Sequence, residues 1–204
     1  MIAIIDYGLG NINAIYTVYK NLNIPVIIAS TNSDLKKSDK FILPGVGAFD
    51  YALQKFNASG MRSTLEKLIT VNKNPILGIC VGMQMLARKS EEGLKTGLDW
   101  IDGEVKIFDQ KSTVNKISIP HMGWNNIIIK NNNPLFYGLN NHTYFYFLHS
   151  YYFKTTLKAN ILSLTKYGKE FISSINHENI YGVQFHPEKS HQAGIKLLKN
   201  FSEL

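Results

Sequence analysis

The chain has 204 residues, with 22 Lys or Arg and 15 Asp or Glu, so its formal net charge at pH 7 is +7. Hydrophobic residues make up 45% and charged residues 18%, which excludes a highly charged disordered chain and predicts one sizeable core and a single domain over residues 1–204. No apolar run approaches the roughly 18 residues of a membrane span. Residues 1–6 lack a basic start and a cleavage site, so we expect a soluble, cytoplasmic chain with no membrane partner.

Few of the cationic residues have the chemistry of base recognition. Arg62 and Arg88 are the only arginines among the 22 cations, whereas base recognition favours the bidentate Arg side chain, so we expect no nucleic-acid partner. A basic surface suits an acidic protein partner instead. Cys80 is the single cysteine, which excludes an internal disulfide and a Cys-based zinc site, and we predict neither a metal nor a cofactor.

The first 80 residues alternate between apolar runs and helical patterns. Apolar runs occupy residues 2–5, 25–29, 41–43 and 75–79, and helical patterns occupy residues 13–22, 51–56 and 61–72. In the last of these, Met61, Leu65, Leu68 and Ile69 fall on one face of a 3.6-residue period. Short apolar strands between helices are typical of a parallel sheet that is covered on both faces, so the sequence predicts an α/β fold.

The pattern changes from about Glu104 onward. Short strand candidates now follow one another with few helices between them, at residues 105–108, 127–129, 144–148, 161–165, 171–176 and 180–185. A final helix is expected over residues 193–201. We therefore predict an open mixed sheet, largely parallel and flanked by helices, with an antiparallel extension in the C-terminal half.

One segment has the layout of a nucleophile elbow. The apolar run 75–79 leads through Gly78-Ile79-Cys80-Val81-Gly82 into a helix-forming stretch. Glycines two residues before and after the nucleophile let a strand turn sharply into a helix, because a Cβ at either position would obstruct the turn. A thiol at the helix N-terminus favours the thiolate, which is the attacking species. The alternative is a buried structural Cys80 beside glycines that pack a helix.

A second segment supplies a candidate base. The predicted strand 180–185 is followed by His186-Pro187-Glu188, so that a carboxylate comes two residues after an imidazole. A cysteine nucleophile needs a base to take its proton, and that base needs a group that orients it. Catalytic groups in open α/β sheets gather at the carboxyl ends of strands, where both Cys80 and His186 are expected. We predict a Cys80-His186-Glu188 triad; the alternative is a strand end with a surface ion pair.

The two segments resemble the nucleophile and His/Glu motifs of the class I (triad) glutamine amidotransferases. Four further segments, 6–11, 44–49, 120–125 and 149–151, are similar to the glutaminase subunits of imidazole glycerol phosphate synthases, so the resemblance covers residues 6–190. It implies that Cys80 attacks the side-chain amide of L-glutamine and releases glutamate and ammonia through a γ-glutamyl thioester. It also implies a heterodimer with a (β/α)₈-barrel cyclase, which uses the ammonia to make imidazole glycerol phosphate and AICAR in histidine biosynthesis.

The resemblance also assigns roles to further residues. The backbone N–H of Val81 is the natural first oxyanion donor, and the second is expected from the Gly45-Val46-Gly47 loop, at Val46 or Gly47. The family implies that this loop is misaimed until the partner has bound its own ligand. Substrate contacts are expected at Gly45, Gln84, Ser150 and Tyr151, although a solvated helix residue, a strand-end hydroxyl and a core aromatic are plain alternatives for the last three. The expected partner interface consists of Asn13, His121, Met122, Trp124 and Lys189, and core packing is the alternative for Trp124.

Other functions are weighed against this one. Gly8-x-Gly10 could begin a dinucleotide fingerprint, but Asn13 holds its third glycine position, so no dinucleotide is expected. A stand-alone Cys-His-Glu hydrolase of γ-glutamyl compounds would use the same three residues. So would a paralogous subunit that feeds ammonia to an enzyme aminating surface sugars. A degenerate module that only binds a partner is disfavoured because all three triad residues are present.

Overall fold

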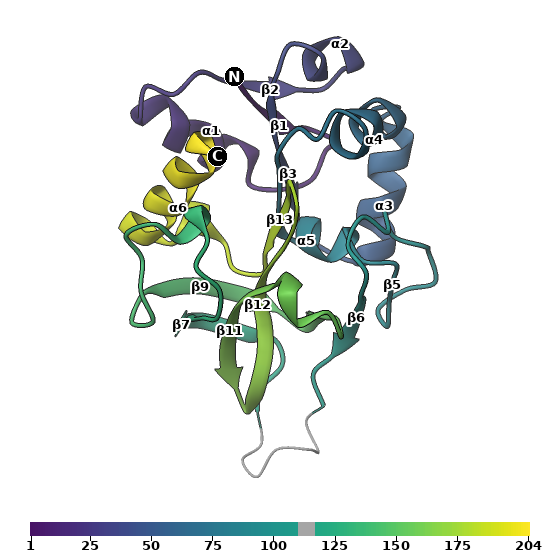
Figure 1. Cartoon of the computed structure of the whole chain (residues 1–204). Coiled ribbons are helices and arrows are strands. Elements are labelled where there is room, and N and C mark those ends of the chain that lie inside the picture. The colour runs from purple at the N-terminus through teal and green to yellow at the C-terminus, as the bar shows by residue number, and fades with distance from the viewer. Residues whose placement is uncertain (110–116) are drawn as a thin grey trace.

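The computed structural model describes residues 1–109 and 117–204 and has a mixed α/β architecture (Figure 1). Five parallel strands form one half of the main sheet, in the order β2 (Val26–Ala29), β1 (Ile2–Ile5), β3 (Lys40–Gly45), β4 (Ile76–Cys80) and β13 (Ile180–Val183). Strands β1 and β4 are buried along their whole length, as the continuous apolar runs predicted.

Helices cover both faces of this parallel half. One side carries α1 (Ile12–Asn21) and α6 (His191–Glu203), and the other carries α3 (Phe49–Ala58), α4 (Arg62–Thr70) and the short α5 (Val81–Met85) (Figure 1). In α4 the buried residues are Leu65 and Ile69, which belong to the predicted apolar face. A short helix that was not predicted, α2 (Asn32–Leu35), begins at a capping box between Thr31 and Asp34.

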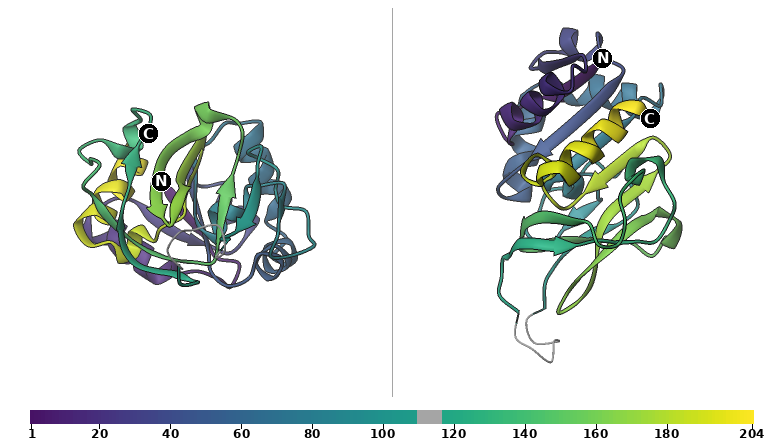
Figure 2. Two further views of the ribbon diagram at one scale, coloured as in Figure 1. Left: turned by 90° about the horizontal axis from the view of Figure 1, so that it is seen from below. Right: turned by 90° about the vertical axis from the view of Figure 1, so that its left-hand side faces the viewer.

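The C-terminal half extends the sheet with mostly antiparallel strands, as predicted. The sheet continues from β13 through β12 (Lys169–His177), β10 (Tyr151–Lys154), β6 (Glu104–Ile107) and β5 (Lys89–Ser90). At its side, β11 (Ile161–Tyr167) pairs with β12 and with β8 (Ile128–Ile129), and single 3₁₀ turns lie at η1 (Pro134–Phe136), η2 (Lys158–Asn160) and η3 (Pro187–Lys189). Figure 2 shows these strands extending beyond the helical part, away from the end where both termini lie.

A second, two-stranded sheet was not predicted. It consists of β7 (His121–Asn126) and β9 (Tyr144–His149), which pair antiparallel. The β9 strand was expected from its apolar run, whereas β7 has only two large apolar residues, Met122 and Trp124, and was not recognised as a strand from its sequence. Side chains alternate between the two faces, so His121 is buried whereas Met122 and Trp124 are exposed.

The pairing of β13 with β4 determines where the chemistry-bearing residues meet. These strands are about a hundred residues apart in sequence and pair in parallel, with Val183 opposite Ile79. Strand β13 ends at Val183, two residues earlier than predicted, and an irregular stretch leads to His186. Because the register aligns the carboxyl ends of both strands, the chain that follows β13 passes directly beside Cys80.

Candidate active site

Cys80 lies on a sharp turn between β4 and α5, and its backbone has φ +56° and ψ −113°. Such a conformation is sparsely populated for a residue with a side chain and is found at functional sites that the surrounding structure holds in place. A Cβ added to Gly78 would lie 2.7 Å from the carbonyl oxygen of Gly82, and one added to Gly82 would overlap the carbonyl oxygen of Leu43. Both positions therefore require glycine for the predicted reason, which is that the backbone segments approach closely at the turn.

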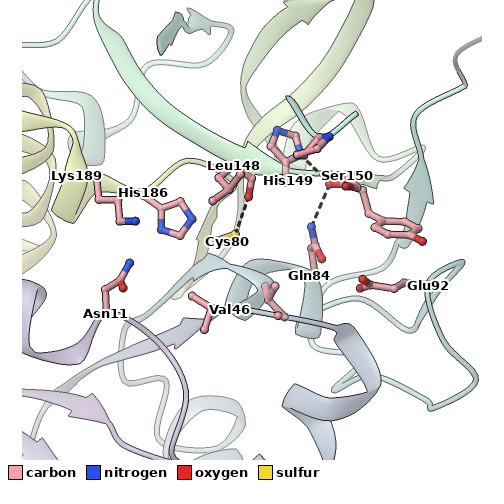
Figure 3. A pocket seen from close by; sticks show the side chains of 14 residues that line it. Asn11, Val46, Cys80, Gln84, Glu92, Leu148, His149, Ser150, His186 and Lys189 are labelled. Carbon is pink, nitrogen blue, oxygen red and sulfur yellow. Dashed lines mark hydrogen bonds between the residues drawn. The ribbon is translucent and has the colours of Figure 1, made fainter. Parts of the chain in front are cut away.

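The thiol of Cys80 faces a pocket of about 330 Å³ at the carboxyl end of the parallel strands (Figure 3). Its Sγ lies 3.8 Å from the carbonyl oxygen of Leu148 and 3.7 Å from Nε2 of Gln184. The side chain is only 4% exposed, and the pocket is its route to solvent. Helix α5 has only five residues, so its dipole is a weaker influence on the thiol than the sequence suggested.

His186 and Glu188 form a buried hydrogen-bonded pair beside this thiol. Nδ1 of His186 lies 2.8 Å from Oε1 of Glu188, and the His186 ring stands next to Cys80 in the pocket (Figure 3). Oε1 also accepts a hydrogen bond of 2.6 Å from Nδ2 of Asn11. The side chains of the pair are 4% and 2% exposed, which excludes the alternative of a surface ion pair.

The electrostatics of the pair follow from burial and from the partners of each group. Burial by itself would lower the pKa of His186, but the hydrogen bonds and charges of Cys80 and Glu188 outweigh it and raise that pKa above its ordinary value. Burial would raise the pKa of Glu188, and the hydrogen bonds from His186 and Asn11 outweigh it and lower that pKa. An imidazolium beside an ionised carboxylate is therefore favoured, and it lies next to the thiol.

The loop after β3 reaches the same pocket. Val46 and Gly47 line it together with Val81, and Gly47 has φ +82°, which suits glycine. Gly45 does not line the pocket, unlike the sequence expectation of a substrate contact. A Cβ on Gly45 would come within 2.8 Å of the carbonyl carbon of Val81 and would overlap the backbone N of Gly82, so Gly45 lets β3 pack against the elbow.

The expected substrate residues of the opposite wall are also brought together. Ser150 and Tyr151 line the pocket, as does Gln84, which is only 2% exposed and so is not a solvated helix residue. Nε2 of Gln84 donates hydrogen bonds of 3.0 Å to the carbonyl oxygen of Tyr151 and 3.0 Å to Oε1 of Gln184. Gln84 therefore connects the elbow helix to the wall formed by residues 148–151, which we call the binding wall.

Five lining residues were not among the predicted site residues: Asn11, Glu92, Pro120, Leu148 and His149. Oε2 of Glu92 accepts a hydrogen bond of 2.9 Å from the backbone N–H of Phe49, and burial raises the pKa of Glu92. Asn11 belongs to a segment that was singled out, and its neighbour Gly10 packs against Pro44. Glu92 lies in a loop with no motif, so only its position in the fold could reveal it.

The expected interface residues divide into two groups. Met122 is 66% and Trp124 46% exposed, so the core alternative for Trp124 is excluded, and Trp124 stacks on His191 with ring centroids 5.1 Å apart. Asn13 is exposed, and Lys189 lines the mouth of the pocket beside Asn11 (Figure 3). His121 is 3% exposed, because it occupies an inward position of β7, so its side chain is not available to a partner.

Two other kinds of feature are absent from the described part of the chain. Within residues 1–109 and 117–204, no group of three or more His, Cys, Asp or Glu side chains is placed to hold a metal ion. In the same two ranges, no helix has the length and apolar character needed to cross a membrane.

Known proteins are similar to this chain in sequence and in architecture. Residues 3–203 match the family model described as "Glutamine amidotransferase class-I". The chain is 51% identical over 204 residues to the "Imidazole glycerol phosphate synthase subunit HisH" of Bdellovibrio bacteriovorus and 47% identical over 204 residues to that of Leptospira borgpetersenii, with 100% of both chains covered in each case. A crystal structure of a glutamine amidotransferase from Thermotoga maritima has a TM-score of 0.65 at 16% identity, covering 99% of this chain and 82% of that one.

Proposed function

The chain belongs to the class I glutamine amidotransferases, and on that premise we propose that it is the glutaminase subunit of an imidazole glycerol phosphate synthase. The observation that supports this most strongly is the pocket in which a strained Cys80 adjoins a buried His186–Glu188 pair. The full-length similarity to subunits named for that synthase supports the assignment of the acceptor reaction.

The reaction proposed for this pocket begins with the thiolate of Cys80, which attacks the side-chain carbonyl carbon of glutamine. The proton from the thiol is held on His186, which Glu188 orients and keeps charged. The carbonyl oxygen becomes an oxyanion, for which the backbone N–H of Val81 and an N–H of the Val46–Gly47 segment are the donors. The tetrahedral species collapses when His186 gives its proton to the leaving nitrogen, so ammonia departs and a γ-glutamyl thioester remains.

The second half of the reaction uses the same groups in the reverse order. A water molecule takes the place of ammonia and gives a proton to His186 as its oxygen attacks the thioester carbonyl. The carbon–sulfur bond then breaks, His186 returns the proton to the sulfur of Cys80, and glutamate leaves. The sum is glutamine plus water to glutamate plus ammonia.

Recognition of the amino-acid end of glutamine is assigned to the wall opposite the triad. Among the described residues that line the pocket, Glu92 is the one with a carboxylate, and an α-ammonium group is its natural partner. Pairing with a cation would offset the burial that raises the pKa of Glu92. Ser150 and Tyr151 provide polar groups on the same side of the pocket.

A partner is part of this proposal, because ammonia released into neutral water is protonated and loses its nucleophilicity. The outward face of the β7–β9 sheet, with Met122, Trp124 and Leu148 exposed, adjoins the pocket at Leu148 and Lys189. An exposed Trp and Met beside a reactive pocket are suited to a protein interface. We assign this face, together with Asn13 and Lys189, to contact with a (β/α)₈-barrel cyclase that receives the ammonia.

The experiment that tests the proposal measures ammonia transfer. The purified chain is mixed with the cyclase subunit of the same organism, the phosphorylated histidine-pathway intermediate and glutamine. We expect imidazole glycerol phosphate and AICAR to form, together with a glutamate release that the partner stimulates. With the Cys80→Ala variant, glutamine should no longer support product formation, whereas added ammonium salt still should.

Other outcomes would replace the proposal. Rapid hydrolysis of γ-glutamyl peptides by the isolated chain, without stimulation by a cyclase, would indicate a stand-alone hydrolase. Ammonia transfer to a surface sugar through another barrel enzyme would indicate the paralogous function.

The interface is tested separately. Trp124→Ala should weaken partner-stimulated turnover, whereas Tyr137→Ala, which removes an aromatic ring that is 75% exposed on a different part of the surface, should not.

A further inference from the structure

Two buried histidines beside the pocket have no role in the reaction proposed above. His121 on β7 and His149 at the end of β9 are cross-strand partners, 3% and 6% exposed. Nδ1 of His121 lies 3.0 Å from Nε2 of His149, and His149 itself lines the pocket. Two imidazoles in direct hydrogen-bond contact must share their protons in a definite way, so their partners decide the tautomer of each ring.

The partners of His149 determine the first tautomer. Nδ1 of His149 lies 2.8 Å from the carbonyl oxygen of Tyr151. A carbonyl oxygen can only accept, so Nδ1 of His149 carries the hydrogen and Nε2 of the neutral ring is an acceptor. Nδ1 of His121 must then donate to it, which places the hydrogen of His121 on Nδ1 as well.

The other end of the chain of hydrogen bonds agrees with this assignment. Nε2 of His121 is left as an acceptor and lies 3.3 Å from Nδ2 of Asn125. The orientation of the Asn125 amide is determined independently, because its Nδ2 also donates to the carbonyl oxygen of Lys166 at 3.0 Å and its Oδ1 accepts from the N–H of Asn126 at 2.9 Å. One arrangement of hydrogens therefore satisfies all the hydrogen bonds from Tyr151 through His149 and His121 to Asn125.

The surroundings keep both rings neutral. The His121 ring is stacked between Phe147 and Tyr167, with centroid distances of 4.8 and 4.0 Å. Burial lowers the pKa of His121 to about 4. The pKa of His149 is lowered to about 3, mainly by burial and in part by the charges of His121 and His186. A proton added to Nε2 of His149 would also point at the N–H of His121, so protonation would break the hydrogen bond between the two rings.

The hydrogen-bonded pair is joined to the pocket through the binding wall, residues 148–151. The carbonyl oxygen of Tyr151 accepts from both His149 and Gln84, and Gln84 belongs to the elbow helix α5. At the other end of the wall, the carbonyl oxygen of Leu148 lies near Sγ of Cys80. The wall is thus held from one side by the elbow (Figure 3) and from the other by His121 of β7, through His149.

We propose that the His121–His149 pair is a positioning element that holds the binding wall of the glutamine pocket against β7, through one set of neutral tautomers. The hydrogen bonds of the two rings that the described residues show go to each other, Asn125 and Tyr151, and none goes to Cys80, His186 or Glu188, so the pair acts on glutamine affinity rather than on the chemical step. The role in affinity rests on the proposed function, whereas the arrangement of protons does not.

The arrangement of protons is tested on the full chain by ¹⁵N NMR of its histidine rings. Both His121 and His149 should appear as neutral rings with the hydrogen on Nδ1, which is the tautomer that free histidine favours less, and should remain so when the pH is lowered from 8 to about 5, above the pKa values of both rings. His121→Asn and His149→Asn variants assign the signals. A hydrogen on Nε2 of His149, or a charged His149 at pH 6, would overturn the inference.

The role in affinity is tested by calorimetry of glutamine binding in the Cys80→Ala background, in which no turnover occurs. His121→Phe keeps a stacked ring but removes the donor to His149, and we expect it to weaken glutamine binding about five- to tenfold, as the loss of one buried hydrogen bond does. His121→Asn should restore most of the affinity, because its Nδ2 is bonded to Cγ as Nδ1 of histidine is. His177→Phe, at an exposed position of β12, is the matched control and should bind as Cys80→Ala does.

The outcomes of the two experiments separate the two proposals. Normal binding by Cys80→Ala with unchanged affinity in the His121→Phe variant would overturn the positioning role and leave the proposed function intact. Absence of glutamine binding by Cys80→Ala itself would overturn the proposed substrate and with it the role in affinity, while the NMR result would still decide the tautomers.

Discussion

Three buried histidines lie around one pocket, and the structure gives them opposite electrostatics. His186, 3% exposed, has a raised pKa, because Cys80 and Glu188 stabilise the charged ring and outweigh the effect of burial. For His121 and His149, 3% and 6% exposed, the described residues show hydrogen bonds to neutral partners, and burial lowers both of their pKa values. Burial by itself therefore lowers the pKa of a histidine, and the raised pKa of His186 comes from the thiol and the carboxylate beside it.

The same contrast separates the two walls of the pocket. The wall around Cys80, His186 and Glu188, which we call the reaction wall, carries the groups whose charge changes during the reaction. The binding wall on the opposite side is held by hydrogen bonds from neutral groups to the carbonyl oxygen of Tyr151. We expect substitutions in the reaction wall to lower kcat and substitutions facing the substrate's amino-acid end to raise KM.

The largest effect should come from Cys80→Ala. Loss of the nucleophile should reduce the kcat of glutamine hydrolysis by about 10⁴-fold or more, since a covalent step has no substitute in this pocket. Glutamine affinity, measured by calorimetry, should change little, because the binding wall is intact. A variant that still releases glutamate at more than about a hundredth of the wild-type rate would contradict the assignment of Cys80, and a loss of affinity comparable with the loss of rate would contradict the division between the walls.

Glu188→Gln should have the next largest effect. The amide keeps the shape but removes the charge that raises the pKa of His186, so that pKa should fall and the ring should lose its proton at lower pH than in the wild type. We expect kcat to fall by about 10³–10⁴-fold, and NMR titration of the His186 ring checks the direction of the shift. An unchanged His186 titration would show that the carboxylate does not control this ring.

A smaller effect, confined to binding, is expected for Glu92→Gln. The amide oxygen of the substituted side chain can still accept the hydrogen bond from the N–H of Phe49, but the charge that pairs with the α-ammonium group of the substrate is lost. KM for glutamine should rise about tenfold with kcat nearly unchanged. Glu91→Gln, at the exposed neighbouring position, is the matched control for steady-state kinetics. A fall in kcat without a rise in KM would move Glu92 from the binding side to the reaction wall.

The smallest effect should come from Asn11→Leu, which sharpens the boundary of the reaction wall. Asn11 acts through Glu188, whose pKa its hydrogen bond lowers, so the substitution should raise the pKa of Glu188 and weaken its hold on His186. We expect kcat to fall about tenfold with KM unchanged. Asn72→Leu, exposed beyond the end of α4, serves as the control. If kcat were unaffected, Asn11 would have no positioning role.

Much of the reaction wall could be predicted from the sequence because its signals are local. The spacing of Gly78, Cys80 and Gly82 describes a turn that has one steric solution, and the order of His186 and Glu188 describes a base with its orienting group. The elements of the parallel half were predicted for the same reason, since an apolar run or an amphipathic period is a property of a few consecutive residues.

Only part of the binding wall could be predicted: Ser150 and Tyr151 were expected as substrate contacts from the resemblance, but the residues that hold this wall in place were not recognised. His121, His149 and Asn125 come from β7 and β9, and the apolar alternation of β7 is limited to Met122 and Trp124. His121 was expected at an interface, and only its inward position on β7 shows that it is buried. Glu92 likewise carries no motif, and its place in the pocket follows from the packing of its loop against the start of α3.

The amino-acid sequence alone determined the α/β class, the turn at Cys80 and the residue types that could act as nucleophile, base and orienting carboxylate, because short-range sterics and hydrophobic periodicity are encoded in neighbouring residues. Only the tertiary structure decided which of them meet. The parallel pairing of β13 with β4 brings His186 to Cys80, and the separate β7–β9 sheet brings two neutral histidines to the opposite wall. Such pairings depend on the free energy of burying whole strands and helices against one another, and this free energy cannot be inferred from any single short segment of the sequence.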